Sequence, residues 1–160
     1  MPALLNLHAL TDEPLPFEGF LPVEELDWGG PDDLVALAGP LHYRLTVQRE
    51  GEVLILIGAL EIELECQCAR CLKPFRYRLS LEPWSAELAL GGPEAIPVVG
   101  EVADLTASLR EDTLLALPLR PLCAPECGGL LPPKSSPTTG WPGAGAAATT
   151  VWSELVKLNL

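Results

Sequence analysis

The sequence predicts an α+β domain, in which one main helix packs on an antiparallel sheet and a cysteine knuckle lies at one end of the sheet. Two segments, residues 41–65 and 72–90, alternate apolar and polar side chains as half-buried strands do. Residues 106–117 have the apolar spacing and the closing proline of an amphipathic helix. Cysteine clusters at residues 66–71 and 123–127 follow these signals, and we expect the two clusters to meet.

The first strand segment is predicted to be a β-hairpin. Apolar side chains occupy every second position of residues 41–49, and a tight turn at Glu50 and Gly51 leads into a long strand at residues 52–65. The first half of that strand is apolar on both faces, which indicates a central or doubly covered position. Its second half alternates with glutamates, so one face is expected in the core and the other in water.

A second strand and the main helix follow. The segment at residues 72–90 is predicted to return along the hairpin, with an apolar face in its first half of Phe75, Tyr77, Leu79 and Leu81. The helix at residues 106–117 ends before Pro118, and its start is marked either by Thr106 or by a capping box of Ser108 and Glu111. Its buried side is predicted to comprise Leu105, Leu109, Leu114 and Leu117.

Shorter elements are predicted in the rest of the domain, which spans residues 1–130. Near the N-terminus we expect a strand at residues 3–9, a helical turn at residues 22–27 that begins with a proline, and a short helix at residues 32–38. Residues 91–101 are predicted to be a loop.

The composition changes after residue 130. Residues 131–150 consist mostly of Pro, Gly, Ala, Ser and Thr, which bury too little apolar surface to offset the entropy of ordering them. A flexible linker is therefore predicted there. The last segment, residues 151–160, has helix-like apolar spacing and is predicted to be a C-terminal docking helix.

The net charge and the short apolar runs limit the possible classes of function. The longest apolar runs are far shorter than the roughly 20 residues of a membrane-spanning helix. The N-terminus lacks the features of a signal peptide, so we expect a cytoplasmic protein, without membrane contact, whose cysteines stay reduced. The formal net charge of −12 argues against wide, sequence-independent contact with nucleic acid, which needs many Lys and Arg side chains.

The charge is unevenly distributed along the chain. Residues 1–65 contain 13 acidic and two basic side chains, whereas residues 66–80 contain four basic ones and no acid. These four are candidate contacts to RNA or to a protein partner: Arg70, Lys73, Arg76 and Arg78. The alternative is that Arg76 and Arg78 only form the solvated face of a strand.

Four cysteines have the spacing of a metal site. Cys68 and Cys71 form a C-x-x-C pair, and Cys123 and Cys127 form a C-x-x-x-C pair. Two ligands on one tight turn point at the same ion, and two such pairs supply the four thiolates of a tetrahedral zinc. Glycines after the second pair give the backbone freedom to turn its amides toward the sulfurs.

Two other interpretations of the cysteines stay open, namely inert thiols and redox chemistry at Cys66, Cys68 and Cys71. In thioredoxin-like proteins the C-x-x-C pair opens a helix, whereas here it leads into a strand. Cys66 is either an additional strand-end thiol or a substitute ligand for Cys68. No enzyme is expected, because His8 and His42 lack a nearby catalytic partner and neither a phosphate loop nor a nucleophile elbow occurs.

Three stretches of the chain, in order, resemble the YceD family of bacterial proteins: "CARCLKPF", "DLTASLREDTLLALPLRPLCAPECGGL" and "WSELVKL". The sharpest match is the C-x-R-C-L unit from Cys68 to Leu72, and the second is the run from Asp104 to Cys123. The family is associated with accumulation of large-subunit ribosomal RNA. Many members carry a cysteine where this chain has Leu131, and then a further C-x-x-C pair that is missing here, which leaves four plausible ligands.

The resemblance implies non-enzymatic support of large-subunit ribosome maturation. The cysteine knuckle is then expected to present its neighbouring cations to large-subunit ribosomal RNA or to a ribosomal protein. The acidic N-terminal half is expected to engage a basic ribosomal protein, since complementary charge speeds encounter. The alternatives are a thiol redox switch and a metal-stabilised protein-interaction module unrelated to ribosomes.

Overall fold

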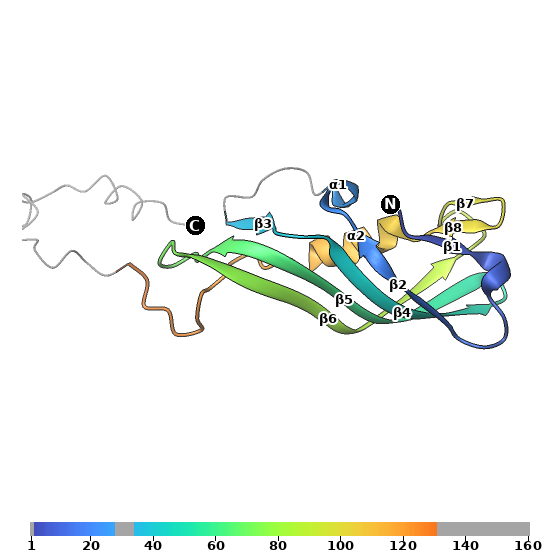
Figure 1. The fold of residues 1–160 in the computed structure, drawn as a ribbon, viewed down its shortest axis with the longest axis horizontal. Helices are drawn as coiled ribbons and strands as arrows, with labels where there is room; N and C mark the ends of the chain where they lie inside the picture. Colours follow the sequence, from blue (N-terminus) through green and yellow to red (C-terminus); the bar gives the residue numbers. More distant parts are fainter. Residues whose placement is uncertain (1, 28–33, 131–160) are drawn as a thin grey trace, which may run out of the picture. The chain divides into compact units, whose positions relative to one another are not determined.

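The computed structural model describes residues 2–27 and 34–130, and its main feature is a five-stranded antiparallel sheet (Figure 1). β5 lies in the middle of this sheet; β4 pairs with its first part, β3 with its last part and β6 with its other side. β2 pairs with β4 and forms an outer edge. The strands are β2 (Leu15–Leu21), β3 (Val35–Leu37), β4 (Leu41–Glu50), β5 (Val53–Gln67) and β6 (Pro74–Ala89).

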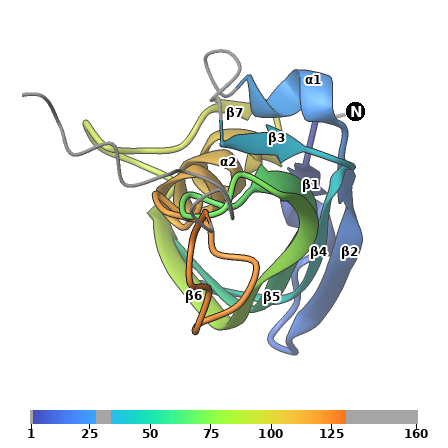
Figure 2. The same ribbon diagram turned by 90° about the vertical axis from the view of Figure 1, so that its left-hand side faces the viewer.

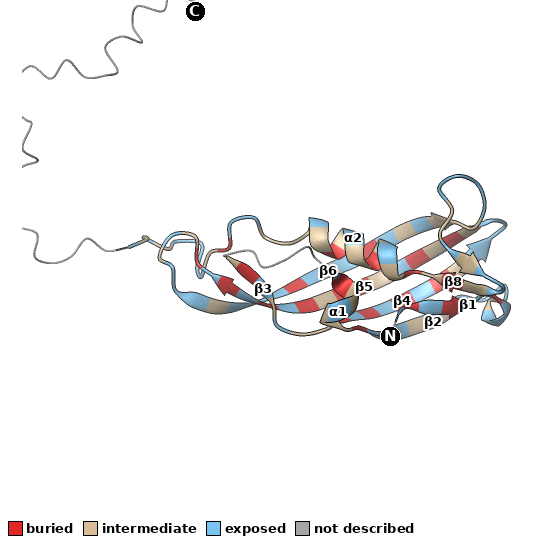
Figure 3. Cartoon of the chain, turned by 90° about the horizontal axis from the view of Figure 1, so that it is seen from above, coloured by how far each residue is buried: buried red, intermediate tan, exposed pale blue. Residues whose placement is uncertain are grey.

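β4 and β5 form the hairpin that the alternating pattern predicts. Their two-residue turn contains Gly51, whose φ of 63° lies in the left-handed region that glycine adopts without strain. Buried and exposed residues alternate along both strands, red and pale blue in Figure 3. One face of the hairpin therefore forms the core, and the fully buried side chains of β5 include Leu54, Leu56, Leu60 and Leu64.

At a β-bulge, the inner face of β6 changes from odd-numbered to even-numbered residues. Leu81 pairs with Leu60 and Trp84 pairs with Gly58, so two residues of β6 oppose a single residue of β5 between these pairs. The odd-numbered face predicted for the first half of β6 is correct for Phe75, Leu79 and Leu81, which are buried or half-buried, but Tyr77 on the same face is exposed. Beyond the bulge, the even-numbered residues from Trp84 onward take over the inner face, which simple alternation does not predict.

Helix α2 (Thr106–Leu115) lies on the concave side of the curved sheet (Figure 2). Leu105 and Leu109 are fully buried at this contact, as predicted, whereas Leu114 and Leu117 are only half-buried. Trp84 is also buried, and its indole Nε1 donates a hydrogen bond to Asp112 Oδ2 at 2.8 Å. This bond attaches the helix to β6 and satisfies the one polar group of the indole.

Smaller elements complete the core. A second sheet has the order β1 (Leu4–Asn6), β8 (Val102–Asp104) and β7 (Val98–Val99). The short helix α1 (Val23–Leu26) is attached to α2 by the Arg110 guanidinium, which donates to the carbonyl oxygens of Leu26 and Asp27.

In the part of the chain that the structure describes, no helix is long and apolar enough to cross a bilayer.

The helix predicted at residues 32–38 is wrong where the structure describes that segment. Val35–Leu37 form β3, which pairs with residues 64–66 of β5. β4 pairs only with the earlier part of β5, and β3 supplies hydrogen-bond partners for the part that remains. A helix of so few residues would gain little in compensation, because forming its first turn is unfavourable.

The N-terminal predictions are correct only in part. The strand expected at residues 3–9 is limited to Leu4–Asn6, and a 3-10 helix (Leu7–Ala9) follows, with the Asn6 side chain accepting a hydrogen bond from the His8 amide. The predicted helical turn is α1, but Pro22 is its N-cap rather than its first residue. β2 is not among the predicted elements; its Pro16 suits an edge strand, where a missing N–H is tolerated.

The boundaries of the other elements also differ from prediction. Helix α2 begins at Thr106 with Leu105 as N-cap, and this N-cap residue makes no side-chain capping bond, so both predicted caps, Thr106 and the capping box of Ser108 and Glu111, are wrong. Instead, Asp104 Oδ1 accepts a hydrogen bond from the Thr106 amide. The predicted loop at 91–101 contains β7. The predicted linker and docking helix at 131–150 and 151–160 lie outside the described residues.

Candidate metal centre

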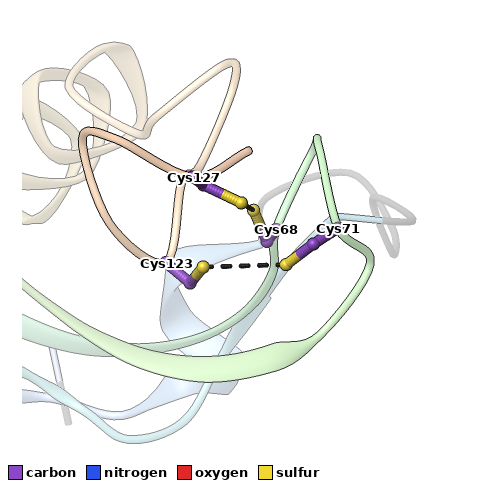
Figure 4. A group of neighbouring side chains, drawn as sticks. All are labelled: Cys68, Cys71, Cys123 and Cys127. Atoms are coloured by element: carbon purple, nitrogen blue, oxygen red, sulfur yellow. Dashed lines mark hydrogen bonds between the residues drawn. The ribbon is translucent and has the colours of Figure 1, made fainter. Parts of the chain in front are cut away.

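Four of the five cysteines converge in one cluster, as Figure 4 shows. The cluster lies beside the last residues of β5, at the end of the sheet opposite the β4–β5 turn. Cys68 and Cys71 lie in the turn between β5 and β6, and Cys123 and Cys127 lie in the segment after α2. Their Sγ atoms all lie within 4.8 Å of one another. The sequence-predicted set is thus brought together from two parts of the chain that are more than fifty residues apart.

The spacing of the sulfurs suits a tetrahedral metal ion. Zinc–sulfur bonds of about 2.3 Å place neighbouring sulfurs of a tetrahedral site about 3.8 Å apart. Here Cys68 Sγ lies 3.7 Å from Cys127 Sγ, and Cys71 Sγ lies 3.6 Å from Cys123 Sγ. All four are free thiols, at separations far beyond the roughly 2.05 Å of a disulfide. The four side chains can therefore hold one metal ion between the two turns.

The first cysteine turn is closed by its own backbone. The Leu72 amide donates to the Cys68 carbonyl oxygen and the Cys68 amide donates to the Lys73 carbonyl oxygen, both at 2.9 Å. Leu72 has a φ of 60°, a left-handed conformation that is unfavourable for a residue with a side chain. β5 and β6 pair directly beside this turn, as far as Gln67 and Pro74, so two long strands hold it in position.

The second cysteine turn has fewer contacts of its own. Within it, the Cys127 amide donates to the Ala124 carbonyl oxygen at 3.1 Å. Besides the contacts between sulfurs, other hydrogen bonds link it to the first turn: the Ala69 amide donates to the Pro121 carbonyl oxygen at 2.8 Å, and Arg70 Nη1 donates to the Cys127 carbonyl oxygen at 3.0 Å. Arg70 therefore joins the two turns in addition to carrying charge.

The turns also determine where protons are held in the cluster. The backbone amide of Cys123, followed by those of Cys71 and Arg70, donates to the Cys68 sulfur and lowers the pKa of this thiol to about 6. Cys123 shows the opposite effect, because hydrogen bonds to the sulfurs of Cys71 and Cys68 raise its pKa to about 12. The hydrogen bonds of the two turns thus shift the pKa values of these two thiols in opposite directions.

Cys66 does not belong to this cluster. It is 3% exposed, lies in β5 opposite Val35 and Phe75, and packs in the apolar core. Burial raises the pKa of its thiol, as expected for a structural cysteine. Of the two interpretations left open by the sequence, the structure favours the additional strand-end thiol.

The four predicted cations have different surroundings. Arg78 Nη2 lies 2.5 Å from Glu61 Oε2, and Arg76 Nη2 lies 3.9 Å from Glu65 Oε1 across the strand pair. These two arginines therefore face carboxylates of β5, as the solvated-strand alternative requires. Arg70 and Lys73 lie in the cysteine turn and are exposed, so they are the cations that accompany the cluster at the tip of the sheet.

The histidines lie away from the cysteines. His8 Nε2 is 3.9 Å from Glu101 Oε2 in an exposed position. His42 lies on the outer face of β4, with its ring centroid 6.4 Å from that of Phe20. His42 and Phe20 line part of a groove that the sequence analysis misses, because it does not predict β2. The signal was available, since Glu18 and Phe20 alternate with Phe17 and Leu21.

Comparison with known proteins gives a family but no structural precedent. Residues 56–158 match the family model described as "Large ribosomal RNA subunit accumulation protein YceD". Uncharacterized proteins of Mycobacterium tuberculosis and Mycobacterium bovis are 30% identical to this chain over 127 residues, which cover 74% of this chain and 61% of theirs. The chain thus spans about three fifths of the length of these relatives. No solved structure matches it.

Proposed function

This chain belongs to the YceD family of large ribosomal RNA subunit accumulation proteins, and we propose that it is a non-enzymatic adaptor in large-subunit ribosome biogenesis, in the cytoplasm. The observation that carries the proposal is the convergence of Cys68, Cys71, Cys123 and Cys127 at one end of the sheet, beside exposed cations. Such a cluster makes a rigid tip from two turns that are distant in sequence.

Zinc is the ion that we assign to this tip. Four sulfur ligands in tetrahedral spacing are typical of structural zinc, and they leave no open position for a substrate or an activated water. This ligand set supports a structural rather than a catalytic role. Bound zinc would replace the remaining protons of the cluster and hold the segment after α2 against the β5–β6 turn.

The charge distribution suggests how the adaptor contacts its partners. Arg70 and Lys73 beside the cysteines offer positive charge to ribosomal RNA or to an acidic patch on a ribosomal protein. Arg76 and Arg78 contribute less, since carboxylates of β5 face them. The acidic remainder of the chain suits a basic ribosomal protein, because complementary potentials speed encounter.

Sedimentation of a cell lysate tests the proposal. The tagged full chain is expected to travel with precursors of the large subunit, and depletion of the chain is expected to lower the ratio of large-subunit to small-subunit ribosomal RNA. Ribonuclease treatment before capture distinguishes RNA from protein contacts. Capture of partners that include no large-subunit RNA or protein would contradict the proposal and favour an interaction module unrelated to ribosomes.

A thiol redox switch is the second candidate, and the sulfur geometry is the observation that favours it. Two sulfur pairs, at 3.6 and 3.7 Å, each join one turn to the other. Hydrogen peroxide would convert each pair of thiols to a disulfide, with two protons and two electrons passing to the peroxide to give water. Disulfide mapping by mass spectrometry after purification with and without peroxide, alongside metal analysis, decides between the switch and a stable zinc centre.

A further inference from the structure

A groove on the outer face of the sheet is separate from the cysteine centre. It has a volume of about 380 Å³ and crosses β2, β4 and β5, which lie side by side (Figure 1). Two cross-strand rows of side chains form its walls. The first row consists of Glu18, Arg44 and Ala59, and the second of Phe20, His42 and Glu61.

The hollow depends on the small side chain of Ala59 in β5. Ala59 lies opposite Arg44 in the β4–β5 register, where a longer side chain would fill the space between the two rows. The groove is therefore a depression built into the sheet between taller side chains.

The polar groups of the first row are free to bind a ligand. Within residues 2–27 and 34–130, no hydrogen bond or ion pair involves the Glu18 carboxylate or the Arg44 guanidinium. They face each other across β2 and β4, yet each keeps its full hydrogen-bonding capacity. Glu61 differs, because its carboxylate accepts a hydrogen bond from Arg78.

The second row supplies aromatic surface. Phe20 is 58% exposed, which is unusual for a large apolar side chain, and its ring is tilted by 49° to that of His42. Exposed rings on an open sheet face are the surfaces on which single-stranded nucleic-acid modules stack bases. The chain has a net charge of −12, so contacts to phosphate would contribute little affinity. We therefore expect the groove to bind the base of a nucleotide rather than its phosphate.

We propose that this groove binds an unstacked guanine base of single-stranded RNA. Guanine has two neighbouring donors, N1–H and the N2 amino group, which match a carboxylate, and two acceptors, O6 and N7, which match a guanidinium. Glu18 supplies the carboxylate, Arg44 supplies the guanidinium, and Phe20 and His42 supply stacking surface. Adenine, cytosine and uracil lack this combination of groups. The inference rests on the proposed role with ribosomal RNA and names a base that this role would recognise.

An NMR titration tests the inference. The isotope-labelled full chain is titrated with each of the four ribonucleoside 5′-monophosphates, and binding is monitored by the chemical shifts of the backbone amides. All four carry the same ribose and phosphate, so differences report the base. GMP is expected to shift signals around Glu18 and Arg44 and to bind at least about fivefold more tightly than AMP, CMP or UMP.

Variants then assign the contacts. Glu18→Gln is expected to weaken GMP binding about tenfold and to remove most of the preference for GMP. Phe20→Ala should weaken all four nucleotides to a similar extent, because stacking does not depend on base identity. Thr46→Ala, an exposed position of β4 outside the groove, is the matched control and should leave binding unchanged.

Three results would overturn the inference: no binding of GMP to the folded chain, equal binding of the four nucleotides, or GMP binding that is unchanged in both Glu18→Gln and Arg44→Met. The proposed role in ribosome biogenesis is measured independently by sedimentation with large-subunit precursors. A chain that sediments with them but does not bind GMP refutes the groove alone, whereas loss of sedimentation refutes the role itself.

Discussion

The two cysteine turns supply the same number of sulfurs to one cluster but differ in how the protein holds them. The first turn is closed by two backbone hydrogen bonds and continues directly into β5 and β6, the longest strand pair of the sheet. The second turn lies in an irregular segment after α2, and it is supported by one internal backbone bond, by bonds from Ala69 and Arg70 of the first turn, and by the contacts between sulfurs. One half of the centre is thus preorganised, and the other half depends on what binds between the turns.

Removal of the zinc that we propose for the cluster is the strongest test of this difference. A chelator is expected to increase amide exchange by more than about 100-fold at Cys127, while the amides of Leu54 and Leu56 in β5 keep their protection. The reason is that the sheet has its own core, whereas the second turn is mainly attached through the sulfurs. Hydrogen exchange with mass spectrometry measures both regions in one experiment. Equal loss of protection in β5 would mean that the turns do not differ as described.

Single cysteine substitutions should separate the cluster from the core thiol. Cys123→Ser and Cys127→Ser are each expected to lower zinc affinity at least about 100-fold, because a four-sulfur site loses one ligand. Cys66→Ala is the control: it should retain the metal and lose only about 1 kcal/mol of stability from the small cavity. Competition with a colorimetric chelator measures the affinity. Retention of full affinity in both serine variants would exclude these sulfurs as ligands.

Arg70 should contribute more to the stability of the fold than Arg76 in β6. Arg70→Met removes the hydrogen bond to the Cys127 carbonyl oxygen and is expected to lower the free energy of unfolding by about 1 kcal/mol. Arg76→Met should change it by less than about 0.5 kcal/mol, because its pairing with Glu65 is long and exposed. Urea denaturation of the two variants makes the comparison. An equal effect would mean that Arg70 does not join the turns.

The smallest effect is expected at the end of the first turn. Leu72→Gly relieves a left-handed conformation and should raise the free energy of unfolding by less than about 1 kcal/mol. Lys73→Gly, one position later, has no such conformation to relieve and should lower it by about 0.5 kcal/mol. Opposite signs in thermal denaturation would support the backbone conformation described for this turn, and the same sign in both would contradict it.

The sequence is informative where chemistry or periodicity is local. Spacing alone selects Cys68, Cys71, Cys123 and Cys127, and the alternation of Leu60, Ile62 and Leu64 with glutamates predicts the long strand. The family resemblance noted on the same motifs is confirmed by the family match.

The incorrect predictions concern segments whose structure depends on pairing with strands that are distant in sequence. Val35–Leu37 become a strand because β5 extends beyond β4, a fact that no local pattern contains. The pairing of Arg78 with Glu61 and the groove between Glu18 and Phe20 likewise depend on the register of neighbouring strands. The binding of zinc and the identity of the partners are still predictions from the sequence.

β5 runs without interruption from the groove to the cysteine turn, so the distance between these two sites is fixed. Between Ala59 and Cys68 the backbone rises about 30 Å at strand geometry. A mononucleotide is too short to touch both ends, whereas a folded RNA or a protein can do so. Only a long molecule would therefore gain avidity from occupying both contact points together, and short fragments of the same molecule would not.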